Sequence, residues 1–108
     1  MERIKQLEAL VNSDPGNALF RYTLGMEYLK AGEHANAAAA LREAIRIDAN
    51  YSAAYRELGK SLEKTGQAEE AARVYQTGIE AANRQGDIQT AKEMEVFLKR
   101  IRKRSGRR

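Results

Sequence analysis

The chain has 108 residues, of which 43% are hydrophobic and 31% are charged, and its formal net charge is +4 at pH 7. This length predicts a single domain, and a composition with one Pro, no Trp and much Ala, Leu, Glu, Lys and Arg favours helices over strands. Because the chain has no Cys, a disulfide framework and a thiolate metal site are both excluded.

The first segment, MERIKQLEALVN, lacks the apolar core of a signal peptide. No run in the sequence approaches the ~20 apolar residues that a helix needs to span a bilayer. We therefore expect a cytoplasmic protein without a membrane span. Residues 2 to 12 have the pattern of a helix, and the sequence SDPGN at 13–17 is expected to end it.

The middle of the chain repeats itself with a period of 34 residues. Small residues recur where two helix backbones must approach closely, and a glycine recurs where a left-handed residue would end the first helix of each pair. Helix ends are expected at Pro15, Ala49 and Asn83, which follow the same period. A single helix pair cannot bury both of its faces, so we predict that neighbouring pairs stack. The other recurring positions are Leu24 and Leu58, Gly25 and Gly59, Gly32 and Gly66, Ala37 and Ala71, and Leu7, Leu41 and Tyr75.

A helix-turn-helix period of this length resembles the tetratricopeptide repeat, whose pattern is an aromatic residue, Leu-Gly, Tyr, Ala, a second aromatic residue and Pro. The first full repeat, residues 18–51, matches at Leu24, Gly25, Tyr28 and Ala37, and the second, residues 52–85, matches at Tyr55, Leu58, Gly59, Ala71 and Tyr75. The departures are Arg21 at an aromatic position, Ala49 and Asn83 in place of Pro, and Gly78 in place of the usual Ala.

The resemblance implies an all-α solenoid of antiparallel helix pairs, with about six helices, of the kind formed by small bacterial repeat proteins. We expect one domain over residues 1–104, made of a half repeat (1–17), two repeats (18–51 and 52–85) and a capping helix (86–104), and then a flexible basic tail (105–108). The capping helix follows from the residues themselves. Asp87 is a suitable N-cap, and apolar residues then recur every three or four positions. These are Ile88, Ala91, Met94, Leu98 and Ile101.

The stretch AYRELGKS at 54–61 fits the loosest form of a phosphate-binding P-loop, which would need a strand, a glycine-rich turn and a helix. Here good helix formers occupy the turn positions, and Gly59 aligns with Gly25, where no Lys-Ser follows. We therefore attribute this glycine to helix packing. His34, the only histidine, is interpreted as a solvated loop residue without metal-binding partners. We expect neither a cofactor nor an enzyme activity.

Tetratricopeptide arrays bind peptides or protein segments on a concave face lined by the first helix of each repeat. The resemblance therefore implies a non-catalytic adaptor or scaffold for protein–protein interaction. Tyr22, Met26 and Glu57 stand where relatives that clamp an acidic chaperone tail have Lys or Asn, so we expect no such carboxylate clamp. The positions implied to face a partner are Leu19, Tyr22, Thr23, Met26, Ala53, Arg56 and Lys60.

The predicted helix 18–29 is apolar on two sides, with Leu24 and Tyr28 on the core side and a stripe of Leu19, Tyr22 and Met26 on another. Two interpretations of this stripe remain open. It forms a groove for an apolar or amphipathic segment, or a contact with a second copy in a homodimer. Alternatively, the N-terminal helix covers it.

The C-terminal ten residues hold seven of the nineteen Lys and Arg residues and no acid. Three interpretations stay open for them: a solvated terminus, contact with the phosphates of a nucleic acid, or docking on an acidic protein surface or membrane. Association with nucleic acid or an acidic surface through these side chains is the alternative to binding on the concave face. The basic residues are Lys99, Arg100, Arg102, Lys103, Arg104, Arg107 and Arg108.

Overall fold

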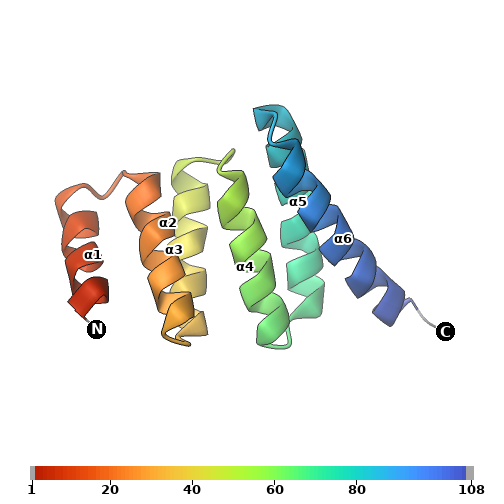
Figure 1. Ribbon diagram of the computed structural model, residues 1–108, viewed down its shortest axis with the longest axis horizontal. Helices are drawn as coiled ribbons and strands as arrows, with labels where there is room; N and C mark the ends of the chain where they lie inside the picture. The colour runs from red at the N-terminus through yellow and green to blue at the C-terminus, as the bar shows by residue number, and fades with distance from the viewer. Residues whose placement is uncertain (1, 107–108) are drawn as a thin grey trace.

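The computed structural model describes residues 2–106, and over that range the chain forms six helices and no strand (Figure 1). This confirms the predicted all-α class and the antiparallel helix pairs. No helix in the described range is long and apolar enough to cross a membrane. The helices are α1 (Glu2–Ser13), α2 (Ala18–Lys30), α3 (His34–Ile47), α4 (Ser52–Lys64), α5 (Ala68–Gln85) and α6 (Ile88–Ser105).

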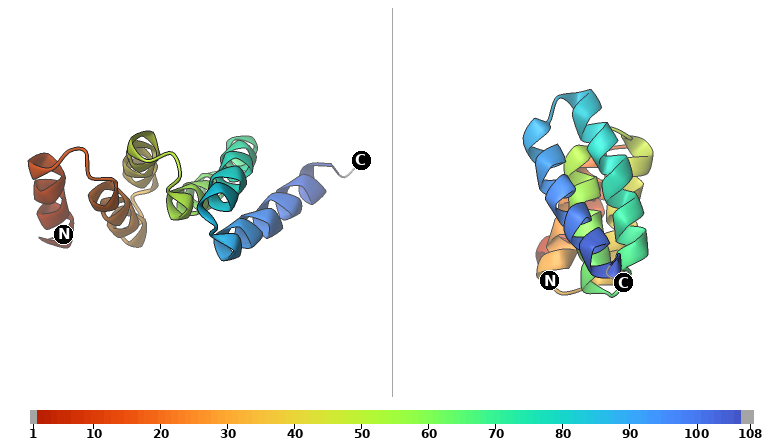
Figure 2. Two further views of the ribbon diagram at one scale, coloured as in Figure 1. Left: turned by 90° about the horizontal axis from the view of Figure 1, so that it is seen from above. Right: turned by 90° about the vertical axis from the view of Figure 1, so that its right-hand side faces the viewer.

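The helices stand side by side in an elongated molecule that measures 49 × 29 × 18 Å along its principal axes. Each helix packs on the next one along the chain, and α4 also packs on α2 and α6. Seen from above, α2, α4 and α6 form one layer, and α3 and α5 form the other (Figure 2). The first helices of successive pairs therefore share one surface, which we call the α2/α4/α6 face.

The helix ends follow local sequence signals. The side chain of Asn17 accepts a hydrogen bond from the Phe20 amide and caps α2. Asp87 accepts a hydrogen bond from the Thr90 amide and caps α6, as predicted. Gly32 and Gly66 adopt left-handed φ angles of 77° and 79° between the helices of each pair. The end predicted for α5 at Asn83 is wrong, because the helix continues to Gln85 and stops at Gly86, which is also left-handed.

Among residues 2–106, the core consists of two hydrophobic clusters. The larger one joins α3, α4, α5 and α6, and its largest fully buried side chains are Tyr75, Leu41, Leu58 and Met94. The smaller one joins α1 to α2 and α3 through Ile4, Leu7, Val11, Leu24 and Ala40.

Glycines allow the close approaches inside this core. A Cβ atom on Gly25 would lie 2.9 Å from the Leu41 side chain, and one on Gly59 would lie 2.2 Å from the Tyr75 ring. Residues 54–61 are continuous helix within α4, so the strand and turn of a P-loop are not formed there. Packing against α5 therefore accounts for Gly59, as predicted from its alignment with Gly25.

Candidate protein-binding surface

The apolar stripe predicted on α2 lies on the α2/α4/α6 face. Leu19 is 57% exposed, and Met26 is half-buried. Tyr22 is also half-buried, and its ring stacks on that of Tyr51 with 5.0 Å between centroids and 27° between planes. The stacking holds the Tyr22 ring against the loop before α4.

The N-terminal helix packs elsewhere on α2. The buried side of α1 lies against the cluster that contains Leu24, with Phe20 and Tyr28 at its edge. Two polar contacts fasten α1 there: the Tyr28 hydroxyl donates to Glu8 at 2.6 Å, and Arg3 pairs with Glu27 at 3.8 Å. The geometry therefore favours the interpretation in which α1 serves the core side of α2 and leaves Leu19 open.

The charged residues predicted on α4 are tied into a network. Arg56 lies between Glu57 at 2.9 Å and Glu93 of α6 at 2.8 Å, and Lys60 pairs with Glu57 at 3.7 Å. Burial lowers the pKa of Arg56, but hydrogen bonds to Glu93 and Glu57 outweigh it and leave that pKa raised. The hydrogen bond from Arg56 in turn lowers the pKa of Glu93. Two acids thus balance the two predicted cations, and they do so at the seam between α4 and α6.

Two of the predicted residues, Met26 and Lys60, line a hollow of about 250 Å³ between the end of α2, the start of α3 and α4. The sequence analysis missed its other cations, Lys30 and Lys64, although they lie one period apart at matching helix ends. The interpretation of His34 as a solvated loop residue is wrong. It is the first residue of α3, it is half-buried, and its Nδ1 atom has no hydrogen-bond partner within residues 2–106.

Thr23 and Ala53, the other predicted contact residues, are half-buried on α2 and α4. Val96 of α6 was not predicted. It is 60% exposed and follows Glu93 by three residues, so it lies near the side of α6 that meets Arg56. A search for apolar residues outside the core period of α6 would have found it.

Most of the basic C-terminal stretch belongs to α6. Arg100 and Arg104 approach Glu63 of α4 at 3.5 and 3.7 Å, and Arg102 donates a hydrogen bond to Gln76 of α5. The Arg100 guanidinium also lies 5.2 Å above the centre of the Phe97 ring. Lys99 and Lys103 are exposed on the same helix. Arg107 and Arg108, which belong to the predicted tail, lie outside the described residues.

Comparison with known proteins supports the repeat assignment. A family model described as the tetratricopeptide repeat matches residues 28–94. A TPR repeat-containing protein of Pseudomonas aeruginosa is 37% identical over 98 residues, which cover 91% of this chain and 93% of that protein.

Solved structures give the same result. A solution structure of a Bordetella parapertussis protein is 36% identical, covers 94% of this chain and 88% of its own, and superposes with a TM-score of 0.79. The type III secretion translocator chaperone SycD of Yersinia enterocolitica superposes with a TM-score of 0.91 over 97% of this chain and 73% of its own. Its identity is 16%, so that likeness concerns the fold alone.

Proposed function

Because the chain belongs to the tetratricopeptide repeat family, whose fold is a module for protein–protein interaction, we propose that the α2/α4/α6 face binds an apolar or amphipathic segment of another protein. The observation that carries this proposal is the stripe on α2, where Leu19 is 57% exposed although α1 packs on the neighbouring side of the helix. Val96 on α6 is similarly exposed. A segment that lies across the face would cover both.

The energetics suit a short partner segment. Removing an aliphatic side chain from water contributes roughly 1.5–3 kcal/mol when burial is complete. Leu19, Met26 and Val96 start half-buried or exposed, so each has surface left to cover. The stacking of Tyr22 on Tyr51 fixes one aromatic edge in advance, which lowers the ordering cost of binding.

The charges of this face contribute orientation more than affinity. Arg56 and Lys60 already pair with Glu57 and Glu93, so these four side chains together offer a partner little net charge. Binding driven by apolar contact should therefore depend only weakly on salt. This property separates the proposed interaction from an electrostatic one.

The test is a peptide selection against the full chain, followed by measurement of affinities with fluorescently labelled selected peptides. Replacing Leu19 and Met26 together by Ser should weaken binding by roughly 100-fold, because the partner loses two apolar contacts. Leu10→Ser is the matched control, since Leu10 is 42% exposed on α1 and lies outside the proposed contact. Its affinity should remain unchanged. Equal affinities for the double variant and the control would contradict the proposal.

The alternative role for the basic residues has a different signature. Phosphate contacts would make affinity for a labelled DNA fall steeply between about 50 and 200 mM salt. Three of the arginines already contact Glu63 or Gln76, so the exposed Lys99 and Lys103 are the ones to replace. Salt-dependent DNA binding that is lost in Lys99→Gln with Lys103→Gln would favour the alternative over the proposed interaction.

A further inference from the structure

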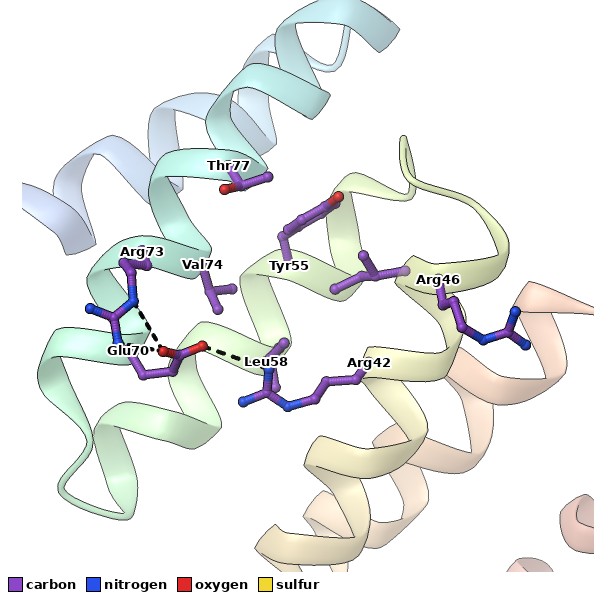
Figure 3. Close-up of a pocket in the computed structure, with 9 residues that line it drawn as sticks. Arg42, Arg46, Tyr55, Leu58, Glu70, Arg73, Val74 and Thr77 are labelled. Carbon is purple, nitrogen blue, oxygen red and sulfur yellow. Dashed lines mark hydrogen bonds and ion pairs between the residues drawn. The ribbon is translucent and has the colours of Figure 1, made fainter.

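A second groove lies on the other side of the molecule, where α3 and α5 both pack on α4. Within residues 2–106, α3 and α5 do not pack on each other, so a gap remains between them above α4. Side chains from all three helices line a groove of about 400 Å³ there (Figure 3). This volume lies in the range of sites that hold a few side chains of a ligand. The lining residues are Arg42, Ile45, Arg46, Tyr55, Leu58, Glu70, Arg73, Val74 and Thr77.

The floor of the groove is apolar, and its rim is basic. Leu58 and Val74 form part of the buried core, and Ile45 is half-buried beside them. Three exposed arginines surround this floor, Arg42 and Arg46 from α3 and Arg73 from α5. Glu70 is the one acid in the lining, so the groove carries a surplus of positive charge.

One ion pair crosses the groove and can be exchanged. Glu70 accepts a hydrogen bond from Arg73 at 2.6 Å on its own helix, and it approaches Arg42 across the gap at 3.7 Å. Because Arg73 already satisfies this carboxylate, an incoming acid can take Arg42 without leaving Glu70 unpaired. Arg46 pairs with Glu43 on its own helix at 3.0 Å, and both side chains are exposed. Exposed pairs of this kind are worth roughly 0–1 kcal/mol, so replacing them costs little.

The positive charge is not a general property of the repeat. Moving each lining position back by one period gives the equivalent positions over α1, α2 and α3. The three arginines then correspond to Glu8, Asn12 and Ala39, and the balance of charges becomes negative. The full equivalent set is Glu8, Val11, Asn12, Arg21, Leu24, Asn36, Ala39, Ala40 and Glu43.

We propose that the groove between α3 and α5 is a second binding site, and that its occupant is an acidic peptide segment with a bulky apolar side chain between its carboxylates. The apolar side chain lies on Ile45 and Val74. The flanking carboxylates pair with Arg42 and Arg46, while Arg73 remains hydrogen-bonded to Glu70. The site faces away from the α2/α4/α6 face, so the protein can hold two segments at once.

The test uses a fluorescein-labelled, C-terminally amidated peptide of sequence Asp-Asp-Leu-Phe-Asp-Asp-Leu with the full chain. We expect a dissociation constant below ~1 mM at about 50 mM salt, and loss of binding when all four Asp residues are changed to Asn. Amide chemical shifts should change around Ile45 and Val74. No binding at that concentration, equal binding of the Asn peptide, or shifts confined to the α2/α4/α6 face would overturn the proposal.

Variants separate the two faces. Arg42→Gln with Arg46→Gln should weaken the acidic peptide by roughly tenfold or more, because two charge pairs are lost. Lys60→Gln with Lys64→Gln removes the same charge from the α2/α4/α6 face and should change its affinity by less than about twofold. The thermal melt confirms that each variant is folded. Equal effects of the two double variants would overturn the assignment to this groove, whereas the proposed function stands or falls with Leu19 and Met26.

Discussion

The helix pairs α2–α3 and α4–α5 follow the same sequence period, but different side chains pack between their two helices. In the first pair, a Cβ atom added to Gly25 would lie 2.9 Å from the aliphatic side chain of Leu41. In the second pair, a Cβ atom added to Gly59 would lie only 2.2 Å from the ring of Tyr75. The second pair also buries a serine, Ser52, which donates a hydrogen bond to Asp87 at 2.7 Å. The period thus determines where the backbones approach, and the residues that fill the gap determine how much change the pair tolerates.

The largest expected difference between the pairs comes from adding one methyl group. Gly59→Ala would place a carbon inside the contact radius of the buried Tyr75 ring, and overpacking of this kind costs roughly 1–3 kcal/mol or more. Gly25→Ala makes a smaller overlap, 2.9 Å from the Leu41 side chain, and the gain in helix propensity of about 1 kcal/mol offsets the strain. We expect about 2–3 kcal/mol of destabilisation for Gly59→Ala and less than about 1 kcal/mol for Gly25→Ala, measured by urea denaturation.

Each of these variants is the control for the other, because both replace a helical glycine by alanine at the same repeat position. Equal losses of stability in the two variants would mean that the ring of Tyr75 moves aside as easily as Leu41. The two pairs would then be equivalent in packing, and the comparison would fail.

Removing the two helix caps should give the next largest difference in the free energy of unfolding. Asp87→Ala removes the acceptor for the Thr90 amide and also the partner of the buried Ser52 hydroxyl. We expect a loss of about 2 kcal/mol, since an unpaired buried hydroxyl adds to the cap loss. Asn17→Ala removes an acceptor for the Phe20 amide, and about 1 kcal/mol is expected.

The same denaturation experiment gives the free energies of both cap variants. Ser52→Ala in the Asp87→Ala background provides a further check. It removes the stranded hydroxyl and should recover part of the loss. A double variant no more stable than Asp87→Ala alone would assign the whole effect to the cap.

The smallest expected difference concerns the pKa values of two tyrosines, which affect stability at alkaline pH. A hydrogen bond to Glu8 raises the pKa of Tyr28 to about 12, and burial then adds to the shift. The pKa of Tyr75 is also raised, first by burial and then by its hydrogen bond to Glu63. Both tyrosines favour the neutral form in the folded chain. Their stabilising effect is therefore complete below the unfolded pKa of about 10 and is lost as the pH rises above it.

Removing each carboxylate separates the two causes. Glu8→Gln should bring the pKa of Tyr28 back toward 10.0, since that hydrogen bond is the main cause of its shift. Glu63→Gln should leave the pKa of Tyr75 raised, because burial remains. Ring resonances of the two tyrosines, followed by NMR across alkaline pH, measure both values. A return of Tyr75 to its ordinary pKa in Glu63→Gln would show that the carboxylate dominates there as well.

Much of the fold could be predicted because it depends on residues that recur. Gly25 and Gly59 repeat at one spacing, and so do Gly32 and Gly66, so a comparison of the chain with itself finds the helix pairs and their turns. Asp87 could be assigned as a cap because it directly precedes an amphipathic run. The cap at Asp87 is a local signal and the recurring glycines are a periodic one, and both kinds can be found in a single sequence.

The contacts that the sequence analysis missed join residues that do not recur. Glu63 accepts a hydrogen bond from the Tyr75 hydroxyl and lies near Arg100 and Arg104. The equivalent position one period earlier is Leu29, which cannot make these contacts. The pairing of Arg56 with Glu93 depends on the angle at which α6 crosses α4, and no spacing in the chain gives that angle. The contribution of Glu93 to neutralising Arg56 was therefore beyond sequence reasoning, although Arg56, Lys60 and Glu57 were named.

Within the described residues 2–106, every helix packs only on helices one or two places away along the chain, and α1 packs mainly on α2. Local opening can therefore begin at either end without breaking the middle, as in other linear arrays. A ligand that lies across α2, α4 and α6 would connect three helices that otherwise depend on their immediate neighbours. Occupancy of that face would then make α2 to α6 open together, while α1 could still open by itself.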